Sequence, residues 1–323
     1  MIKIFSRLVL LAVSLGLAGA VPASADEWPS RPITVVVPLP PGLASDSMAR
    51  VVFEQVGRQV GQKFVIENRP GAGGTIGANA VARADPDGYT MLVYGSLAAA
   101  AALYSKLPFD PVNDLAPVVP FGQQPLAVVA APGRFKDMGD LIARAKAKPG
   151  SLNYASAGVG SAAHFGAERL LTSAKLQVQH IPFRGGEYFT ETVAGRVDFT
   201  VTPLATAINL IRDGKLEALA VSAEKRSQLL PQVPTLLEAG LTSDAIYPFY
   251  SPVYLPAGTP QPIVERVHDE VTKALAVPSV QERLVKLGVE PMPMSVAEFQ
   301  KFFRADVARN TALVEAAKIP RQE

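Results

Sequence analysis

The stretch Ile33-Thr34-Val35-Val36-Val37 is apolar and mostly β-branched, and it closes at Pro38. Such a run is typical of a strand buried on both faces. A proline-rich loop, residues 38–46, then leads into a helical pattern in which apolar residues recur every three to four positions: Met48, Val51, Val52 and Val56. Asp46 is suited to capping that helix. Strand, loop and helix in this order predict an α/β fold.

The same unit recurs along the chain. Strands are expected over residues 63–67 and 90–94, with a helix over 75–84 between them. A second series has strands over 126–130, 153–156, 178–181, 197–201 and 218–222, with helices over 137–148 and 161–173. Three more helices are expected to start near Gln261, Ser279 and Ser295. This alternation predicts sheets of parallel strands flanked by helices.

Two lobes are expected, because a single core is near its practical limit at this chain length. The proline-rich segments 117–125 and 248–256 are the best candidates for connections that cross between the lobes. If the chain crosses twice, lobe 1 contains residues 26–124 and 251–323, and lobe 2 contains residues 125–250. A ligand cleft would lie between the lobes.

The first 25 residues have the pattern of a secretory signal peptide. Lys3 and Arg7 precede the apolar run Leu8–Ala20, and Ala23-Ser24-Ala25 forms a small-residue cleavage site. The run is shorter than the ~20 residues that a spanning helix needs. Stable insertion in a membrane is therefore not expected, and the periplasm is the predicted location.

Charge and composition exclude several classes of protein. Removal of the signal peptide takes away two basic residues, so that the remaining basic residues equal the 29 acidic ones in number. Nucleic-acid binding, which requires a concentrated basic face, is not expected. Cysteine is absent, so no disulfide is expected.

Three glycine-rich loops follow predicted strands, where α/β proteins usually hold small ligands. In the first, Gly42, Leu43, Ala44 and Ser45 keep N–H groups that can face an anion at a helix N-terminus. The second loop, residues 68–77, fits neither the dinucleotide nor the phosphate-loop pattern. The third loop, residues 156–161, leads into the helix that carries His164, and it could face the first loop across a cleft.

Catalytic and metal-binding patterns are poor. Ser161 lacks the glycine two residues later that a nucleophile elbow has. The three histidines are not paired at metal-binding spacing, and no HExxH helix exists. No catalytic residue, no metal site and no cofactor are therefore predicted. A periplasmic hydrolase is the least favoured function.

A series of motifs in order along the chain resembles one family. They are Trp28-Pro29-Ser30-Arg31-Pro32-Ile33, the proline loop ending in Asp46, and residues 68–74, 84–90, 107–111, 154–164, 180–185, 214–221, 230–235 and 256–260. The sequence is similar to the Bug family, the substrate-binding proteins of tripartite tricarboxylate transporters. The resemblance covers nearly the whole chain after the signal peptide.

The resemblance implies a two-lobed periplasmic binding protein, similar to type II, that closes on a small organic solute and delivers it to a membrane permease. The solute is commonly a carboxylate, held in the family by the first loop and by loops of the other lobe. The family loop usually reads Pro-Pro-Gly-Gly, whereas Leu43 follows Gly42 here. The Leu43 side chain is expected to narrow the pocket or to alter carboxylate capture.

The expected ligand-binding set combines these considerations. It is Pro40, Gly42, Leu43, Ser45, Asp46, Ser96, Ser156, Gly160, Ser161, His164, Arg184 and Thr202. Arg184 is included because a guanidinium can donate two parallel hydrogen bonds to a carboxylate. Asp46 is favoured as a helix cap over a direct ligand contact, and Asp198 either binds ligand or ties down a neighbouring loop. The protein is expected to be a monomer, and a periplasmic solute sensor feeding a signalling partner is the alternative function.

Overall fold

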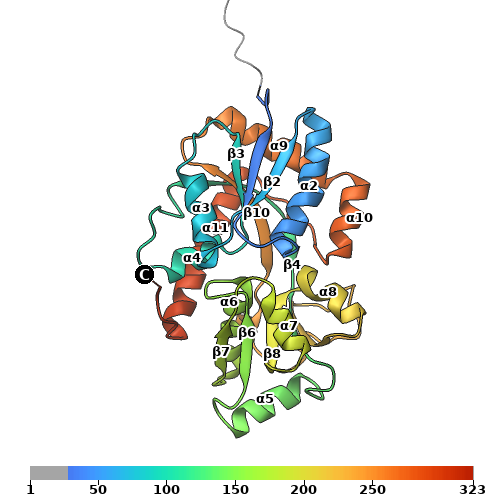
Figure 1. Ribbon diagram of the computed structural model, residues 1–323. Coiled ribbons are helices and arrows are strands. Elements are labelled where there is room, and N and C mark those ends of the chain that lie inside the picture. Colours follow the sequence, from blue (N-terminus) through green and yellow to red (C-terminus); the bar gives the residue numbers. More distant parts are fainter. Residues whose placement is uncertain (1–27, 323) are drawn as a thin grey trace, which may run out of the picture. The chain divides into compact units, whose positions relative to one another are not determined.

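The computed structural model describes residues 28–322 (Figure 1). The predicted signal peptide lies outside the described residues. From Arg31 onward, the strands form two five-stranded sheets, and helices flank each of them. The predicted α/β fold with two helix-flanked sheets is confirmed.

The first sheet has the strand order β2-β1-β3-β10-β4. Its strands are β1 (Ile33–Val37), β2 (Phe64–Asn68), β3 (Thr90–Val93), β4 (Leu115–Gln124) and β10 (Phe249–Pro256). β1 runs parallel to β2 and β3, with Val35 paired to both Ile66 and Met91. β10 is antiparallel to both of its neighbours, β3 and β4.

Seven helical elements accompany the first sheet. They are α2 (Ala44–Val60), η1 (Ala72–Gly74), α3 (Thr75–Ala82), α4 (Leu97–Leu103), α9 (Gln261–Leu275), α10 (Pro278–Lys286) and α11 (Val296–Ala316). α11 begins with a capping box, in which Ser295 and Glu298 bond reciprocally to each other's backbone N–H. Phe299 and Phe303 anchor α11 in the core, because both are fully buried.

The second sheet has the strand order β7-β6-β8-β5-β9. Its strands are β5 (Leu126–Ala130), β6 (Asn153–Ser156), β7 (Gln179–Pro182), β8 (Phe199–Pro203) and β9 (Glu217–Ser222). Its helices are α5 (Met138–Ala147), α6 (Ala162–Ala174), α7 (Glu187–Val193), α8 (Leu204–Arg212) and the short η2 (Ser243–Ala245). β6 is parallel to β7 and β8, whereas β5 is antiparallel to β8 and β9.

One expectation from the sequence was wrong, and a second needs a correction. The sheets are mixed rather than parallel, because β10 and β5 run antiparallel to their neighbours. The proline-rich segments expected as connections are largely strands, β4 and β10. Their prolines are tolerated because β4 is an edge strand and Pro252 of β10 lies at a register shift. Only the ends of these strands connect to the other sheet.

The chain passes directly from one sheet to the other at Pro125. Gln124 is the last residue of β4 and Leu126 is the first residue of β5. The buried Gln124 side chain accepts a hydrogen bond of 2.7 Å from the Ala205 backbone N–H, at the start of α8. A residue of the first sheet therefore contacts a helix of the second sheet beside the crossing point.

Candidate functional site

A cavity of about 40 Å³ lies where the loops of the two sheets meet. The first-sheet side contributes Leu39, Leu43, Ala44, Ser45, Gly73, Tyr94, Ser96 and Phe249. The second-sheet side contributes Ala157, Ser161, Ala162, Ala163, Tyr188, Pro203 and Thr206. The cavity walls therefore come from both sheets in nearly equal number.

Three helices begin at this cavity. The residues that precede α2, α6 and α8 are Leu43, Ser161 and Pro203, and all three line the cavity wall. The first N–H groups of a helix have no partner within it, and the helix dipole gives its N-terminus a partial positive charge. Convergence of the α2 and α6 N-termini favours an anion without any basic side chain. The Leu204 and Ala205 N–H groups that open α8 are already engaged, by the Pro125 carbonyl and the Gln124 side chain.

The cavity lining, as far as the chain is described, contains no charged side chain. Its polar side chains are hydroxyls: Ser45, Tyr94, Ser96, Ser161, Tyr188 and Thr206. Some of them are held in place by neighbours. The Ser45 Oγ lies 2.9 Å from the Ser251 Oγ of β10, and the Tyr94 hydroxyl donates to the Gly73 carbonyl. A ligand would therefore meet neutral hydroxyl groups, some of which are fixed by hydrogen bonds within the protein.

Asp46 orders the first loop from within the first turn of α2. Its Oδ2 accepts a hydrogen bond of 2.9 Å from the Gly42 N–H, and its Oδ1 accepts one of 3.0 Å from the Asn68 side chain. Arg50 forms an ion pair with the same carboxylate. Asp46 is thus a loop-ordering residue, although Leu43 rather than Asp46 occupies the N-cap position.

The pKa of the Asp46 carboxyl reflects this network. Burial alone would raise the pKa, because it disfavours the charged form. The hydrogen bonds from Arg50, Gly42 and Asn68 outweigh burial, and they hold the pKa below its usual value. The carboxylate therefore remains charged and keeps the loop in one conformation.

The third loop is held by two histidines. The His180 Nε2 lies 2.7 Å from the Ser156 Oγ, and the His164 Nδ1 accepts a hydrogen bond from the Gly160 N–H at 3.3 Å. Burial lowers the pKa of His164 to about 3 and that of His180 to about 4. Both rings are therefore neutral near pH 7, so the His164 Nδ1 is free to accept.

Of the expected ligand-binding residues, four line the cavity directly: Leu43, Ser45, Ser96 and Ser161. Gly42, Asp46, Ser156, Gly160 and His164 lie behind the cavity wall and support the two loops. Thr202 also lies behind the cavity wall, where its Oγ1 is 2.7 Å from the hydroxyl of the cavity residue Tyr188. The structure thus brings the first and third loops together.

Pro40 and Arg184 lie at the junction of the two sheets, outside the cavity lining. Gly185 packs so closely on Pro40 that a Cβ at Gly185 would lie 2.6 Å from the Pro40 Cγ. Arg184, the preceding residue, is exposed. Arg184 therefore lies next in the chain to a residue that packs on the first loop, and it does not line the cavity.

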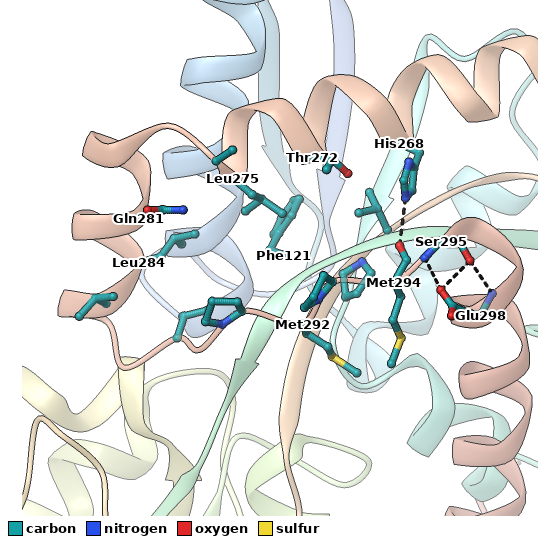
Figure 2. A pocket seen from close by; sticks show the side chains of 17 residues that line it. Phe121, His268, Thr272, Leu275, Gln281, Leu284, Met292, Met294, Ser295 and Glu298 are labelled. Atoms are coloured by element: carbon teal, nitrogen blue, oxygen red, sulfur yellow. Dashed lines mark hydrogen bonds between the residues drawn. The ribbon is translucent and has the colours of Figure 1, made fainter.

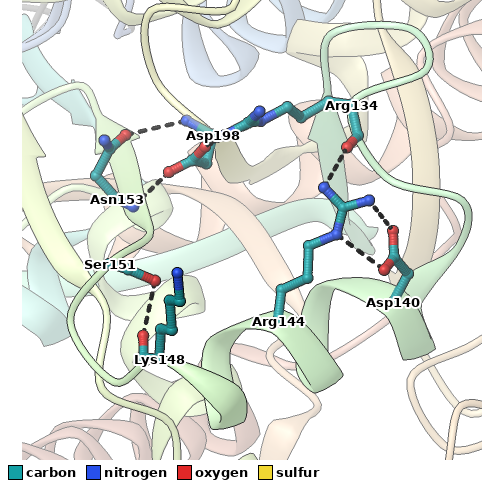
Figure 3. Close-up of polar contacts among 7 residues, drawn as sticks. All are labelled: Arg134, Asp140, Arg144, Lys148, Ser151, Asn153 and Asp198. Atoms are coloured by element: carbon teal, nitrogen blue, oxygen red, sulfur yellow. Dashed lines mark hydrogen bonds and ion pairs between the residues drawn. The ribbon is translucent and has the colours of Figure 1, made fainter.

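Asp198 ties a neighbouring loop to the second sheet (Figure 3). Its Oδ2 accepts a hydrogen bond of 2.7 Å from the Asn153 N–H, and its Oδ1 pairs with the Arg134 guanidinium. The Asn153 side chain in turn accepts from the Asp198 N–H at 3.0 Å. Both carboxylate oxygens are engaged in the fold, which favours the structural interpretation of Asp198 over ligand contact.

Several cavity residues were not anticipated from the sequence: Leu39, Gly73, Tyr94, Tyr188, Pro203, Thr206 and Phe249. Tyr94 could have been found, because it directly follows β3 and ligands bind beyond the carboxyl ends of parallel strands. No sequence pattern around Tyr188 or Phe249 marks these residues as part of a binding site. They reach the cavity only through the packing of α7 and β10.

Two helix-flanked sheets with an anion-favouring cavity between them define a two-lobed binding protein. Comparison with known proteins gives the family. A family model described as "Tripartite tricarboxylate transporter family receptor", TctC, matches residues 48–319. The chain belongs to this family of solute-binding receptors, which are not enzymes, and the resemblance to Bug proteins is confirmed.

Similar proteins support the same assignment. BugT of Bordetella pertussis is 34% identical over 313 residues, which cover 95% of this chain and 96% of BugT. MatC from Rhodopseudomonas palustris, solved with bound malate, has a TM-score of 0.83 and 33% identity, covering 89% of this chain and 100% of MatC. Rpa4515 of R. palustris, solved with adipate, has a TM-score of 0.87 and 30% identity, covering 92% of this chain and 100% of the other.

Two further findings concern residues 28–322. No helix in this range has both the length and the apolar character needed to cross a membrane. Within the same range, no three histidine, aspartate or glutamate side chains gather closely enough to hold a metal ion.

Proposed function

We propose that this protein captures a small carboxylate in the cavity between its two sheets, in the periplasm, and delivers it to a tripartite tricarboxylate-type permease. The observation that carries the proposal is the convergence of the α2 and α6 N-termini on one cavity without charged side chains. Free backbone N–H groups and helix dipoles from both sheets would share the negative charge. The carboxylates bound by MatC and Rpa4515 fit the same chemistry.

The ligand-contacting set is proposed to be Leu43, Ser45, Ser96 and Ser161. Gly42, Asp46, Ser156, Gly160, His164 and Thr202 would keep the contacting groups in position. Pro40 and Arg184 would act at the cleft edge, where the exposed guanidinium attracts an incoming anion. Leu43 fills the space that a glycine would leave open, and it therefore limits the size of the ligand.

Ligand entry requires the lobes to move. A water molecule needs roughly 10–15 Å³ of such space, so the cavity of about 40 Å³ holds about three waters. Even a four-carbon dicarboxylate is larger than that. We infer that lobe 1 (residues 26–124 and 251–323) and lobe 2 (residues 125–250) separate about the segments 124–126 and 250–253.

Calorimetry on matched ligands tests the binding chemistry. A panel of small carboxylates that includes malate and adipate is compared with the corresponding amides, which have the same shape but no charge. At least one carboxylate should bind with one-to-one stoichiometry, and its amide should bind about a hundredfold more weakly. An amide that binds as tightly as its acid would contradict the proposal.

Small-angle scattering on the same complex tests lobe movement. A ligand that contacts both lobes favours the closed form, so the radius of gyration should decrease when the best carboxylate binds. An unchanged radius would argue against closure around the proposed segments.

Uptake assays distinguish a permease partner from a signalling partner. Deletion of the gene for this chain should abolish uptake of the labelled carboxylate if a permease receives it. Normal uptake with a lost transcriptional response would instead favour the sensor. Such a result would overturn the delivery step and leave the binding site in place.

A further inference from the structure

A second and larger pocket lies beside the edge strand β4, among elements that accompany the first sheet (Figure 2). Its volume is about 710 Å³, and it shares no lining residue with the cavity between the sheets. Helices α9 and α10, strand β4 and the segment 289–295 form its walls. Pockets of 300–1,000 Å³ commonly hold small molecules.

The walls of this pocket are mainly apolar. They include Phe121, Leu275, Leu284, Val285, Met292 and Met294. Val285 is 47% exposed, which is unusual for a large apolar side chain in the described part of the chain. Exposed apolar side chains that gather in a concave site often mark a place where a ligand binds.

The pocket is rigidly built on the side of β4. The Gln123 N–H donates to the Glu290 carbonyl at 2.9 Å, and the Glu290 N–H donates to the Gln123 carbonyl at 2.7 Å. Gly122, with φ of +139°, permits this approach, because a Cβ there would lie 2.5 Å from the Glu290 carbonyl oxygen. These hydrogen bonds fix the start of the segment 289–295 against β4.

The segment Pro291-Met292-Pro293-Met294 forms the opposite wall. Prolines at alternate positions restrict the backbone to extended conformations, which keeps the wall open. Methionine side chains are flexible and polarizable, so they adapt to apolar ligands of different shape. This combination of a stiff backbone and adaptable side chains suits a ligand site.

The polar groups of the pocket are mostly engaged within the protein. The His268 Nε2 lies 3.0 Å from the Met294 carbonyl, and Glu298 accepts hydrogen bonds from the Ser295 N–H and hydroxyl (Figure 2). Thr272 and Gln281 lie at the exposed edge. A ligand would therefore gain few strong polar contacts, and apolar contact would dominate its binding.

The charged side chain of the lining disfavours anions. Among the described residues that line the pocket, Glu298 is acidic and none is lysine or arginine. A carboxylate or sulfonate would therefore find no cation and would meet the Glu298 carboxylate. The second pocket thus lacks the preference for anions that we propose for the cavity between the sheets.

We propose that this pocket is a second ligand site, which takes one neutral, largely apolar small molecule. The site is separate from the carboxylate site, because the two share no lining residue. Its occupant is recognised by apolar contact with the methionine, leucine and phenylalanine side chains rather than by charge.

The probe for this site is N-phenyl-1-naphthylamine, a neutral dye whose fluorescence rises in apolar surroundings. Titration of the folded protein should show saturable binding with one dye per chain. In a spectrum of ¹³C-methyl-labelled methionine, the Met292 and Met294 signals should shift on addition of dye. The signals of Met48, Met91 and Met138, which are buried elsewhere, should stay in place.

A matched pair of variants locates the dye. Ala276 lines the pocket at its exposed edge, so Ala276→Trp should fill the pocket and weaken dye binding at least about tenfold. Ala143, an exposed residue of α5, serves as the control, and Ala143→Trp should leave dye affinity unchanged. If Ala276→Trp does not fold, Val285→Lys at the exposed wall should weaken the neutral dye in the same way.

An anionic dye tests the proposed ligand class. 8-Anilinonaphthalene-1-sulfonate has similar rings but a negative charge, and it should bind at least about tenfold more weakly than the neutral dye. The proposal is overturned if the neutral dye shows no saturable binding or shifts neither Met292 nor Met294. Equal dye affinity in folded Ala276→Trp, or equal affinity for the anionic dye, also overturns it.

Discussion

The imidazole rings of His164 and His180 stack on each other, with their centroids 4.3 Å apart and their planes 15° from parallel. The ring of Tyr154 covers the other face of His180 at 4.7 Å, and its hydroxyl donates to Glu168. Through Ser156 and Gly160, this stack holds the third loop at the edge of the cavity. The neutral state of two histidines is therefore coupled to the shape of the site.

This coupling predicts a loss of stability in mild acid. The pKa values of about 3 and about 4 in the folded protein lie below the ordinary value of about 6.5, so the unfolded chain binds more protons below pH 6.5. The stabilising contribution is complete above pH 6.5 and is lost as the pH falls toward 4. The free energy of unfolding should decrease by up to about 1.4 kcal/mol per pH unit for each histidine.

Urea unfolding between pH 4.5 and 7.5 measures this slope. In His164→Gln and His180→Gln, one titrating ring is removed, so the decrease should be shallower than in the wild type. If a variant retained the full wild-type slope, the histidine that it lacks would not contribute to the pH dependence of the free energy of unfolding.

Ser161 allows charge to be tested without loss of the helix cap. The Ser161 Oγ accepts a hydrogen bond from the His164 N–H at the start of α6, and both Asp and Asn can replace it in that role. Ser161→Asp places a negative charge in the anion site, and it should weaken carboxylate binding about a hundredfold or more. Ser161→Asn has similar size without the charge, so it should retain much more affinity. If calorimetry gave the same carboxylate affinity for Ser161→Asp and Ser161→Asn, charge at this position would not influence binding.

Asp46→Asn tests whether the first loop must be ordered for binding. The substitution weakens the ion pair with Arg50. It also replaces one carboxylate oxygen, which now accepts a hydrogen bond from Gly42 or Asn68, by an N–H₂ group that cannot accept one. We expect a loss of about 1–3 kcal/mol in the free energy of unfolding and weaker carboxylate binding. Arg58→Gln, which breaks an exposed pair on the same helix, is the control and should change stability by less than about 1 kcal/mol. Unchanged affinity in Asp46→Asn would show that the loop order is dispensable.

Arg184→Gln tests the exposed guanidinium at the junction. If Arg184 contacts the bound carboxylate when the lobes close, its loss should weaken binding by about 2 kcal/mol and reduce the salt dependence. Arg212→Gln removes another exposed guanidinium of the second-sheet region, at the end of α8, and should have little effect. If Arg184→Gln changed the carboxylate affinity by less than about twofold, Arg184 would be a surface residue with no role in binding.

The strands with regular apolar patterns were predictable from the sequence. Leu126–Ala130 and Asn153–Ser156 have the bounds expected from their patterns, because short buried strands depend mainly on local composition. β10 was not recognised as a strand, because its prolines suggest a connection. Its pairing with β4 absorbs Pro252 at a register shift, which is a tertiary effect that local rules do not contain.

The site was predictable to the extent that it is built from strand-to-helix loops. Leu43 and Ser161 precede helices, and the general geometry of α/β proteins places such residues beside ligands. Tyr188, Thr206 and Phe249 reach the cavity from α7, α8 and β10, whose positions depend on packing between distant segments. No local pattern marks them.

A crystal structure of the protein with its tightest carboxylate tests the central claim most directly. The account predicts density for the carboxylate between Leu43 and Ser161, with its oxygens accepting hydrogen bonds from N–H groups at the starts of α2 and α6. Density for the carboxylate outside this cavity, or contacts with one lobe only, would contradict the claim that both lobes capture the ligand together.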